Sequence, residues 1–79
     1  MTITINQEDV SQTALDATRA SFNPSKLPQV DGIKLLAAAL ITECEKIRDL
    51  GKASREASIA ITEIEAGAMW AVKAATKGL

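Results

Sequence analysis

The pattern of apolar residues in the last third of the chain predicts one long helix over residues 53–77. This stretch contains no proline, and alanine, glutamate and other helix-favouring residues dominate it. One apolar stripe recurs at alternating spacings of four and three residues: Ala57, Ile61, Ile64, Ala68, Ala71 and Ala75. Other apolar side chains lie off that stripe: Ile59, Met69, Trp70 and Val72. Because packing on one neighbour needs only one stripe, we expect the helix to be buried on several sides, partly by other copies of the chain.

A second apolar pattern predicts a helix from about Pro28 to about Leu50. Proline suits the first turn of a helix, and Gly51 is a typical residue to end one. Apolar residues at three-four spacing predict a seam that faces a neighbouring helix: Val30, Ile33, Ala37, Leu40, Cys44, Ile47 and Gly51. Only Lys52–Ser54 separates the two helices, and Ser54 is expected to cap the following one. So short a connection predicts an antiparallel helical hairpin.

The residues before the hairpin predict a short helix over about Gln7–Ala20, with Asn6 as its N-cap. Met1–Ile5 alternates polar and apolar residues like a strand, but no second strand is predicted to pair with it, so we expect an extended arm. Ser21–Gln29 is predicted to be a loop, since its Asn-Pro pair favours a turn.

These elements predict an all-α fold in a single domain. Residues 1–24 would form the N-terminal arm and short helix, and residues 25–79 the long antiparallel hairpin. A chain of 79 residues buries little apolar surface by itself, so we expect it to assemble as a homo-oligomer.

The composition excludes several classes of function. Nine basic and ten acidic residues give a net charge of −1, which argues against binding to polymeric nucleic acid or to a membrane surface. The chain has no histidine and a single cysteine, Cys44, so a zinc site, an intrachain disulfide and a nucleophile–base pair are not expected. We expect no enzyme, no metal, no cofactor and no membrane span or signal peptide, and we place the protein in the cytoplasm.

Two groups of side chains are candidates for binding an anion. Lys34 lies one turn into the second helix, just after the loop that contains Phe22. Arg55, Ser58 and Thr62 share one face at the start of the third helix, where the helix dipole favours negative charge. Taken by their spacing alone, Lys34 and Arg55 are most simply interpreted as solvated surface charges.

Two segments resemble a family of phage proteins. The segment from Arg55 to Ala74, which ends in Met-Trp-Ala-Val-Lys-Ala, is similar to the last helix of the phage anti-CBASS sponges, which are related to the sponges that counter Thoeris immunity. Phe22–Ser25 and Val30–Ala38 resemble the preceding loop and helix. The resemblance covers roughly residues 22–77.

This resemblance implies a compact homohexamer without catalytic activity that sequesters the cyclic oligonucleotide signals of bacterial defence. It implies a site for cyclic dinucleotides, such as cyclic GMP–AMP, in which a base stacks on an aromatic residue and a lysine contacts the phosphates. This site maps onto Phe22, Asn23, Pro24 and Lys34. It implies a separate site for cyclic trinucleotides where several protomers meet, and this site maps onto Arg55, Ser58 and Thr62. The family often has tyrosine where this chain has Phe22.

A second hypothesis comes from a different class. The chain could be a structural helical-hairpin oligomer that acts as a protein-binding adaptor or an antitoxin-like module. Binding of cyclic di- or trinucleotides would distinguish the two.

Overall fold

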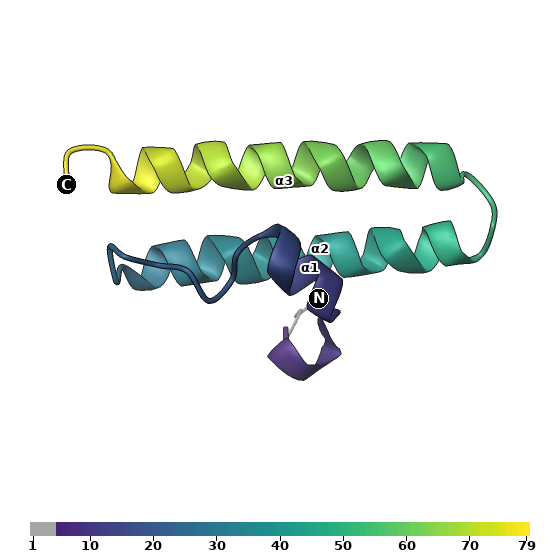
Figure 1. The fold of residues 1–79 in the computed structure, drawn as a ribbon, viewed down its shortest axis with the longest axis horizontal. Coiled ribbons are helices and arrows are strands. Elements are labelled where there is room, and N and C mark those ends of the chain that lie inside the picture. Colours follow the sequence, from purple (N-terminus) through teal and green to yellow (C-terminus); the bar gives the residue numbers. More distant parts are fainter. Residues whose placement is uncertain (1–4) are drawn as a thin grey trace, which may run out of the picture.

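The protein is described here by a computed structural model covering residues 5–79, and it is a helical hairpin with a short N-terminal segment packed on it (Figure 1). The elements, in chain order, are a 3₁₀ turn η1 (Gln7–Asp9), then α1 (Gln12–Ala17), α2 (Pro28–Asp49) and α3 (Ser54–Thr76). Helices α2 and α3 run antiparallel side by side, and α1 lies against α2. The predicted all-α fold and hairpin are confirmed. Residues 1–4 of the expected extended arm lie outside the described residues.

The ends of the two long helices follow local backbone chemistry. Pro28 occupies the first turn of α2, as predicted. Gly51 has φ +79°, a left-handed conformation that glycine adopts without steric cost, and it ends the α2 segment. The predicted cap at Ser54 is wrong: the N-cap of α3 is Ala53, itself left-handed at φ 52°, and no side chain caps this end. The connection is so tight that the chain turns through two left-handed residues.

The single helix expected over residues 7–20 is wrong, because the segment is broken in two. Ser11, rather than Asn6, is the N-cap of α1, and its hydroxyl accepts a hydrogen bond from the backbone N–H of Ala14 (3.0 Å). The backbone N–H of Ser11 donates instead to Thr42 of α2 (3.1 Å). A serine that satisfies the start of one helix cannot continue the one before it. The apolar content of the segment does not reveal this break.

The carboxylate of Glu45, on the polar side of α2, holds α1 against that helix. The hydroxyl of Ser11 donates to Glu45 Oε1 (2.5 Å) and the hydroxyl of Thr13 donates to Oε2 (2.6 Å). Burial raises the pKa of Glu45, but these two hydrogen bonds and the nearby charge of Arg48 lower it, and the net pKa lies below the ordinary 4.5. The ionised carboxylate therefore stabilises the docked position of α1.

The core lies where α1 and α2 meet, and α3 closes it on one side. Its fully buried cluster consists of Val10, Ala14, Ala38 and Ile41, with Ile61 and Ile64 of α3 packed against it. The predicted seam of α2 is only partly right: Val30, Ala37 and Cys44 are buried, whereas Leu40 and Ile47 are 53 % and 48 % exposed. Helix α2 packs on both α1 and α3. Its buried face therefore differs from the seam that would face a single partner helix.

Helix α3 matches the two-sided pattern of its sequence. Its predicted stripe faces α2, and Ala57 in that stripe is buried. Met69 and Trp70 are 74 % and 65 % exposed, and Ile59 is also exposed. These apolar side chains therefore have no cover within the described chain. None of the helices in residues 5–79 combines the length and the apolar character needed to cross a lipid bilayer.

Candidate functional site

Four residues that the sequence assigned to one site lie together at the end of the hairpin opposite the α2–α3 connection. Phe22, Asn23, Pro24 and Lys34 all line one pocket of about 450 Å³. The last turns of α3 and the C-terminal end close its other side with Val72, Thr76 and Leu79. The fold thus brings the loop after α1, the first turns of α2 and the end of α3 to a single place (Figure 1).

Asn23 determines the shape of the loop in this pocket. Its Nδ2 donates to the carbonyl of Leu27 (2.9 Å) and to Asp31 Oδ1 (3.0 Å). Its Oδ1 accepts from Ser25 Oγ (2.6 Å) and from the backbone N–H of Lys26 (3.1 Å). Both amide hydrogens and the amide oxygen are therefore used within the loop. Asn23 contributes to the pocket mainly by fixing the path of the backbone.

Lys34 is not a solvated surface charge. Its side chain is only 7 % exposed, and its ammonium group donates to the carbonyl of Arg19 (3.0 Å) and to the carbonyl of Phe22. The ammonium nitrogen also lies 5.4 Å from the centroid of the Phe22 ring, within the range of a cation–π contact. Phe22 as a residue remains 57 % exposed, so part of it is open to a ligand.

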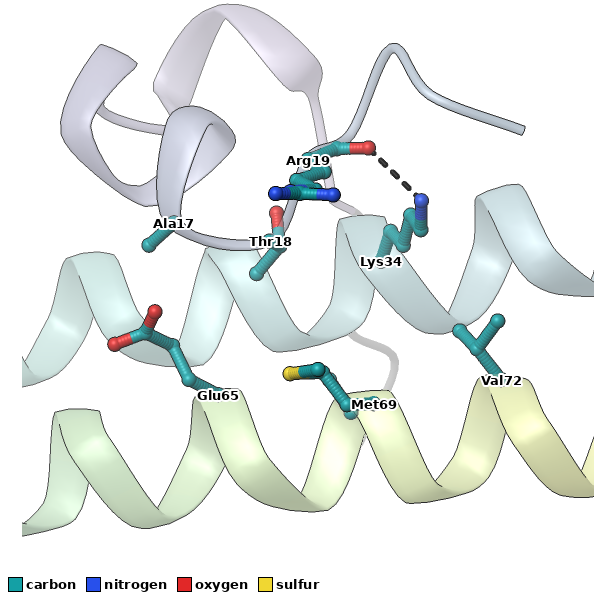
Figure 2. Close-up of a pocket in the computed structure, with 8 residues that line it drawn as sticks. Ala17, Thr18, Arg19, Lys34, Glu65, Met69 and Val72 are labelled. Carbon is teal, nitrogen blue, oxygen red and sulfur yellow. Dashed lines mark hydrogen bonds between the residues drawn. The ribbon is translucent and has the colours of Figure 1, made fainter. Parts of the chain in front are cut away.

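A second pocket, of about 440 Å³, shares Lys34 and Val72 with the first (Figure 2). Arg19 lies on its α1 side, and Glu65 and Met69 come from α3. The sequence patterns did not single out Arg19 or Glu65, since each looks like an ordinary surface charge. Met69 did carry a signal, because it is apolar and lies off the stripe that faces α2. Together the two pockets form a half-open surface along the side of α3.

The second predicted group lies at the other end of α3, close to the α2–α3 connection. Ser58 and Thr62 line a shallow depression of about 280 Å³ together with Ile59 and Glu63, and Arg55 is not among its lining residues. The hydroxyl of Thr62 donates to the carbonyl of Ser58 (3.2 Å). Within one chain the depression is open, and the one charged side chain that lines it is a carboxylate, that of Glu63.

The described chain adds no metal-binding cluster and no exposed thiol to these pockets. No group of three or more histidine, cysteine, aspartate or glutamate side chains in residues 5–79 is arranged to hold a metal ion. Cys44 is a free cysteine and is buried, as its position on the α2 seam predicts. The pocket around Phe22 presents an aromatic ring, a buried ammonium and a loop ordered by hydrogen bonds.

The fold and these pockets define the class of protein: a short helical hairpin with a pocket-lining loop at one end and polar groups at the other. A comparison with protein families identifies the class more narrowly, because the model of the Acb2/Tad1 hairpin domain matches residues 13–76. The match spans more than half of the chain, and the protein belongs to the Acb2/Tad1 hairpin family. No curated protein and no solved structure gave a significant match.

Proposed function

We propose that the protein is a non-enzymatic sponge that binds cyclic di- and trinucleotide immune signals in the bacterial cytoplasm and so blocks CBASS-type anti-phage defence. The observation that carries this proposal is the family match over residues 13–76, which includes both candidate sites. The protein would act by lowering the free concentration of the signal. Such a mechanism requires tight binding and an abundant protein but no chemical step.

The pocket around Phe22 is the proposed site for cyclic dinucleotides. A nucleobase stacked on the open part of the ring gains about 1–3 kcal/mol, and this gain depends on the ring face rather than on a hydroxyl group. Lys34 supplies a positive charge beside the same ring. Phenylalanine in place of the tyrosine common in the family is therefore compatible with this role.

The start of α3 is the proposed site for cyclic trinucleotides. A chain with a net charge of −1 can bind an anion tightly only where its cations are concentrated. Rotational symmetry would bring Arg55 from several protomers to one place, together with the hydroxyls of Ser58 and Thr62. The open depression of the single chain supports a site that is shared between protomers.

We further propose that the protein assembles as a homohexamer. The exposed side chains of Met69 and Trp70 lie on the same long helix as the second candidate site, and their burial by another copy would stabilise an assembly. The mass of the assembly, measured by light scattering at micromolar concentration, is expected to be several times 8.4 kDa.

The proposal is tested by calorimetric titration with a panel of cyclic dinucleotides and cyclic trinucleotides, with the matching linear dinucleotide as control. We expect submicromolar binding of at least one cyclic ligand, weaker binding of the linear one, and recovery of the ligand intact. A saturating ligand at 100 times its Kd should also stabilise the folded protein by about 2.7 kcal/mol. Absence of binding across the panel would refute the sponge and would leave the adaptor hypothesis.

A further inference from the structure

Residues 19–22 form a tight turn that carries Phe22 to the rim of its pocket. The backbone N–H of Phe22 donates to the carbonyl of Arg19 (2.9 Å), which closes the turn. Arg19 itself has φ 51°, a left-handed conformation that costs free energy in any residue with a Cβ atom. Neither glycine nor proline occurs in this turn. Its first half is tied to the end of α1, because the backbone N–H groups of Arg19 and Ala20 donate to carbonyls of that helix (3.1 and 3.0 Å), and its second half has only the hydrogen bond of Phe22 within the turn.

Lys34 binds this turn at both ends. Its ammonium group donates to the carbonyl of Arg19, where the turn begins, and to the carbonyl of Phe22, where it ends. Figure 2 shows the first of these bonds, with the lysine side chain rising from α2 toward the carbonyl of Arg19. An ammonium has three hydrogens, and two of them are used on backbone oxygens of one turn.

The burial of Lys34 shows that this arrangement is a defined part of the fold. A lysine that is 7 % exposed must satisfy its charge inside the protein, because an unpaired buried ammonium is strongly unfavourable. No carboxylate forms an ion pair with Lys34 in the described residues. Backbone carbonyls therefore take that role, and a loop that moves away from α2 loses both of its hydrogen bonds to the ammonium.

We infer that Lys34 is a positioning residue for the ligand site: it holds the turn of residues 19–22 closed on α2 and so fixes the ring of Phe22 where a base can stack on it. This inference rests on the proposed function for the identity of the ligand, but the holding of the turn is a property of the protein without ligand. The role of Lys34 in holding the turn is separate from any contact between its ammonium group and a phosphate of the ligand.

The experiment measures hydrogen–deuterium exchange of the Phe22 amide in the protein without ligand, and then the affinity for cyclic GMP–AMP. The variant Lys34→Met removes the ammonium and keeps an unbranched side chain. We expect the Phe22 amide to exchange about tenfold faster or more, and the affinity to fall by about tenfold or more. The amide of Gly51, which donates to Arg48 at the far end of the hairpin (3.0 Å), is the internal reference and should not change.

Two further variants serve as controls. Lys26→Met removes the same charge from an exposed lysine in the same loop, and its Phe22 amide should exchange at the wild-type rate. Lys34→Arg keeps donors for the two carbonyls, and its exchange should stay within about threefold of wild type. The Lys34→Arg variant also serves as the test if Lys34→Met fails to fold. Unfolding of Lys34→Met together with normal exchange in Lys34→Arg would support the role of the side-chain N–H donors in holding the turn.

Wild-type exchange of the Phe22 amide in a folded Lys34→Met variant would overturn the positioning role, whatever happens to the affinity. Equal acceleration in Lys26→Met would overturn it as well, because the effect would then come from charge alone. If the wild-type protein binds no cyclic nucleotide, the proposed function fails, while the exchange measurement still decides whether Lys34 holds the turn.

Discussion

Replacing Glu45 with alanine should detach α1 from α2, and the size of the effect can be worked out from its contacts. The carboxylate accepts hydrogen bonds from the hydroxyls of Ser11 (2.5 Å) and Thr13 (2.6 Å). A hydrogen bond to a charged group contributes about 1.5–3 kcal/mol, but water can replace the bond at the exposed Thr13. We therefore expect a net loss of about 1–2 kcal/mol in the free energy of unfolding.

The assay is thermal unfolding at a fixed protein concentration, since the stability of an oligomer depends on concentration. In a domain of this size, a loss of 1 kcal/mol lowers Tm by about 4–8 °C. Glu43→Ala is the matched control, because Glu43 forms an ion pair with Lys46 (3.0 Å) in which both side chains are 64 % exposed. Such surface pairs contribute about 0.2–1 kcal/mol, so the control should lose clearly less.

The effect of Glu45 should also depend on pH. Its pKa in the folded protein lies below the ordinary 4.5, so the ionised form is favoured by folding. Its contribution is therefore fully present above about pH 5 and is lost as the pH falls through the folded pKa. The difference in Tm between wild type and Glu45→Ala should shrink steadily below pH 4.5. Equal losses for Glu43→Ala and Glu45→Ala at pH 7, or a difference that persists at pH 2, would refute this reasoning.

Three further predictions concern the binding sites and the assembly. Phe22→Ala should weaken cyclic dinucleotide binding by about one to two decades with little change in Tm, and Phe22→Tyr should bind normally in the same calorimetric titration. Unfolding of Phe22→Ala would instead show that Phe22 is needed for the fold. Arg55→Ala should weaken cyclic trinucleotides by at least about tenfold and leave dinucleotides nearly unaffected, and equal losses for both ligand sizes would argue for a shared site. Trp70→Glu should dissociate the oligomer in light scattering because it would bury an unpaired charge, whereas an unchanged mass would place the interface elsewhere.

The sequence by itself determined the two long helices and their antiparallel pairing. The alanine-rich segment without proline, the proline at the start of α2 and the glycine between the helices are local signals, and each acts within a few residues of where it stands. The two-sided apolar pattern of α3 likewise predicted surface that the hairpin leaves exposed, and Met69 and Trp70 are exposed in the fold.

The break in the N-terminal helix was decided by tertiary contacts. Ser11 begins a new helix because Thr42, more than thirty residues away, accepts a hydrogen bond from its backbone N–H, and Glu45 accepts hydrogen bonds from the hydroxyls of Ser11 and Thr13. The same docking of α1 explains why Leu40 is exposed although it lies on the predicted seam of α2. A periodic pattern shows which residues share a face, but not how many neighbours the helix has.

The environment of Lys34 was also decided by the tertiary structure. Its place in the sequence, one turn into a helix and off the apolar seam, is typical of a solvated charge. In the fold, the turn after α1 crosses α2 at this point and presents two backbone carbonyls to the ammonium. Backbone carbonyls are the same for every residue type, so the sequence carries no direct signal for such a contact. Only the path of the chain in space places Arg19, Phe22 and Lys34 together.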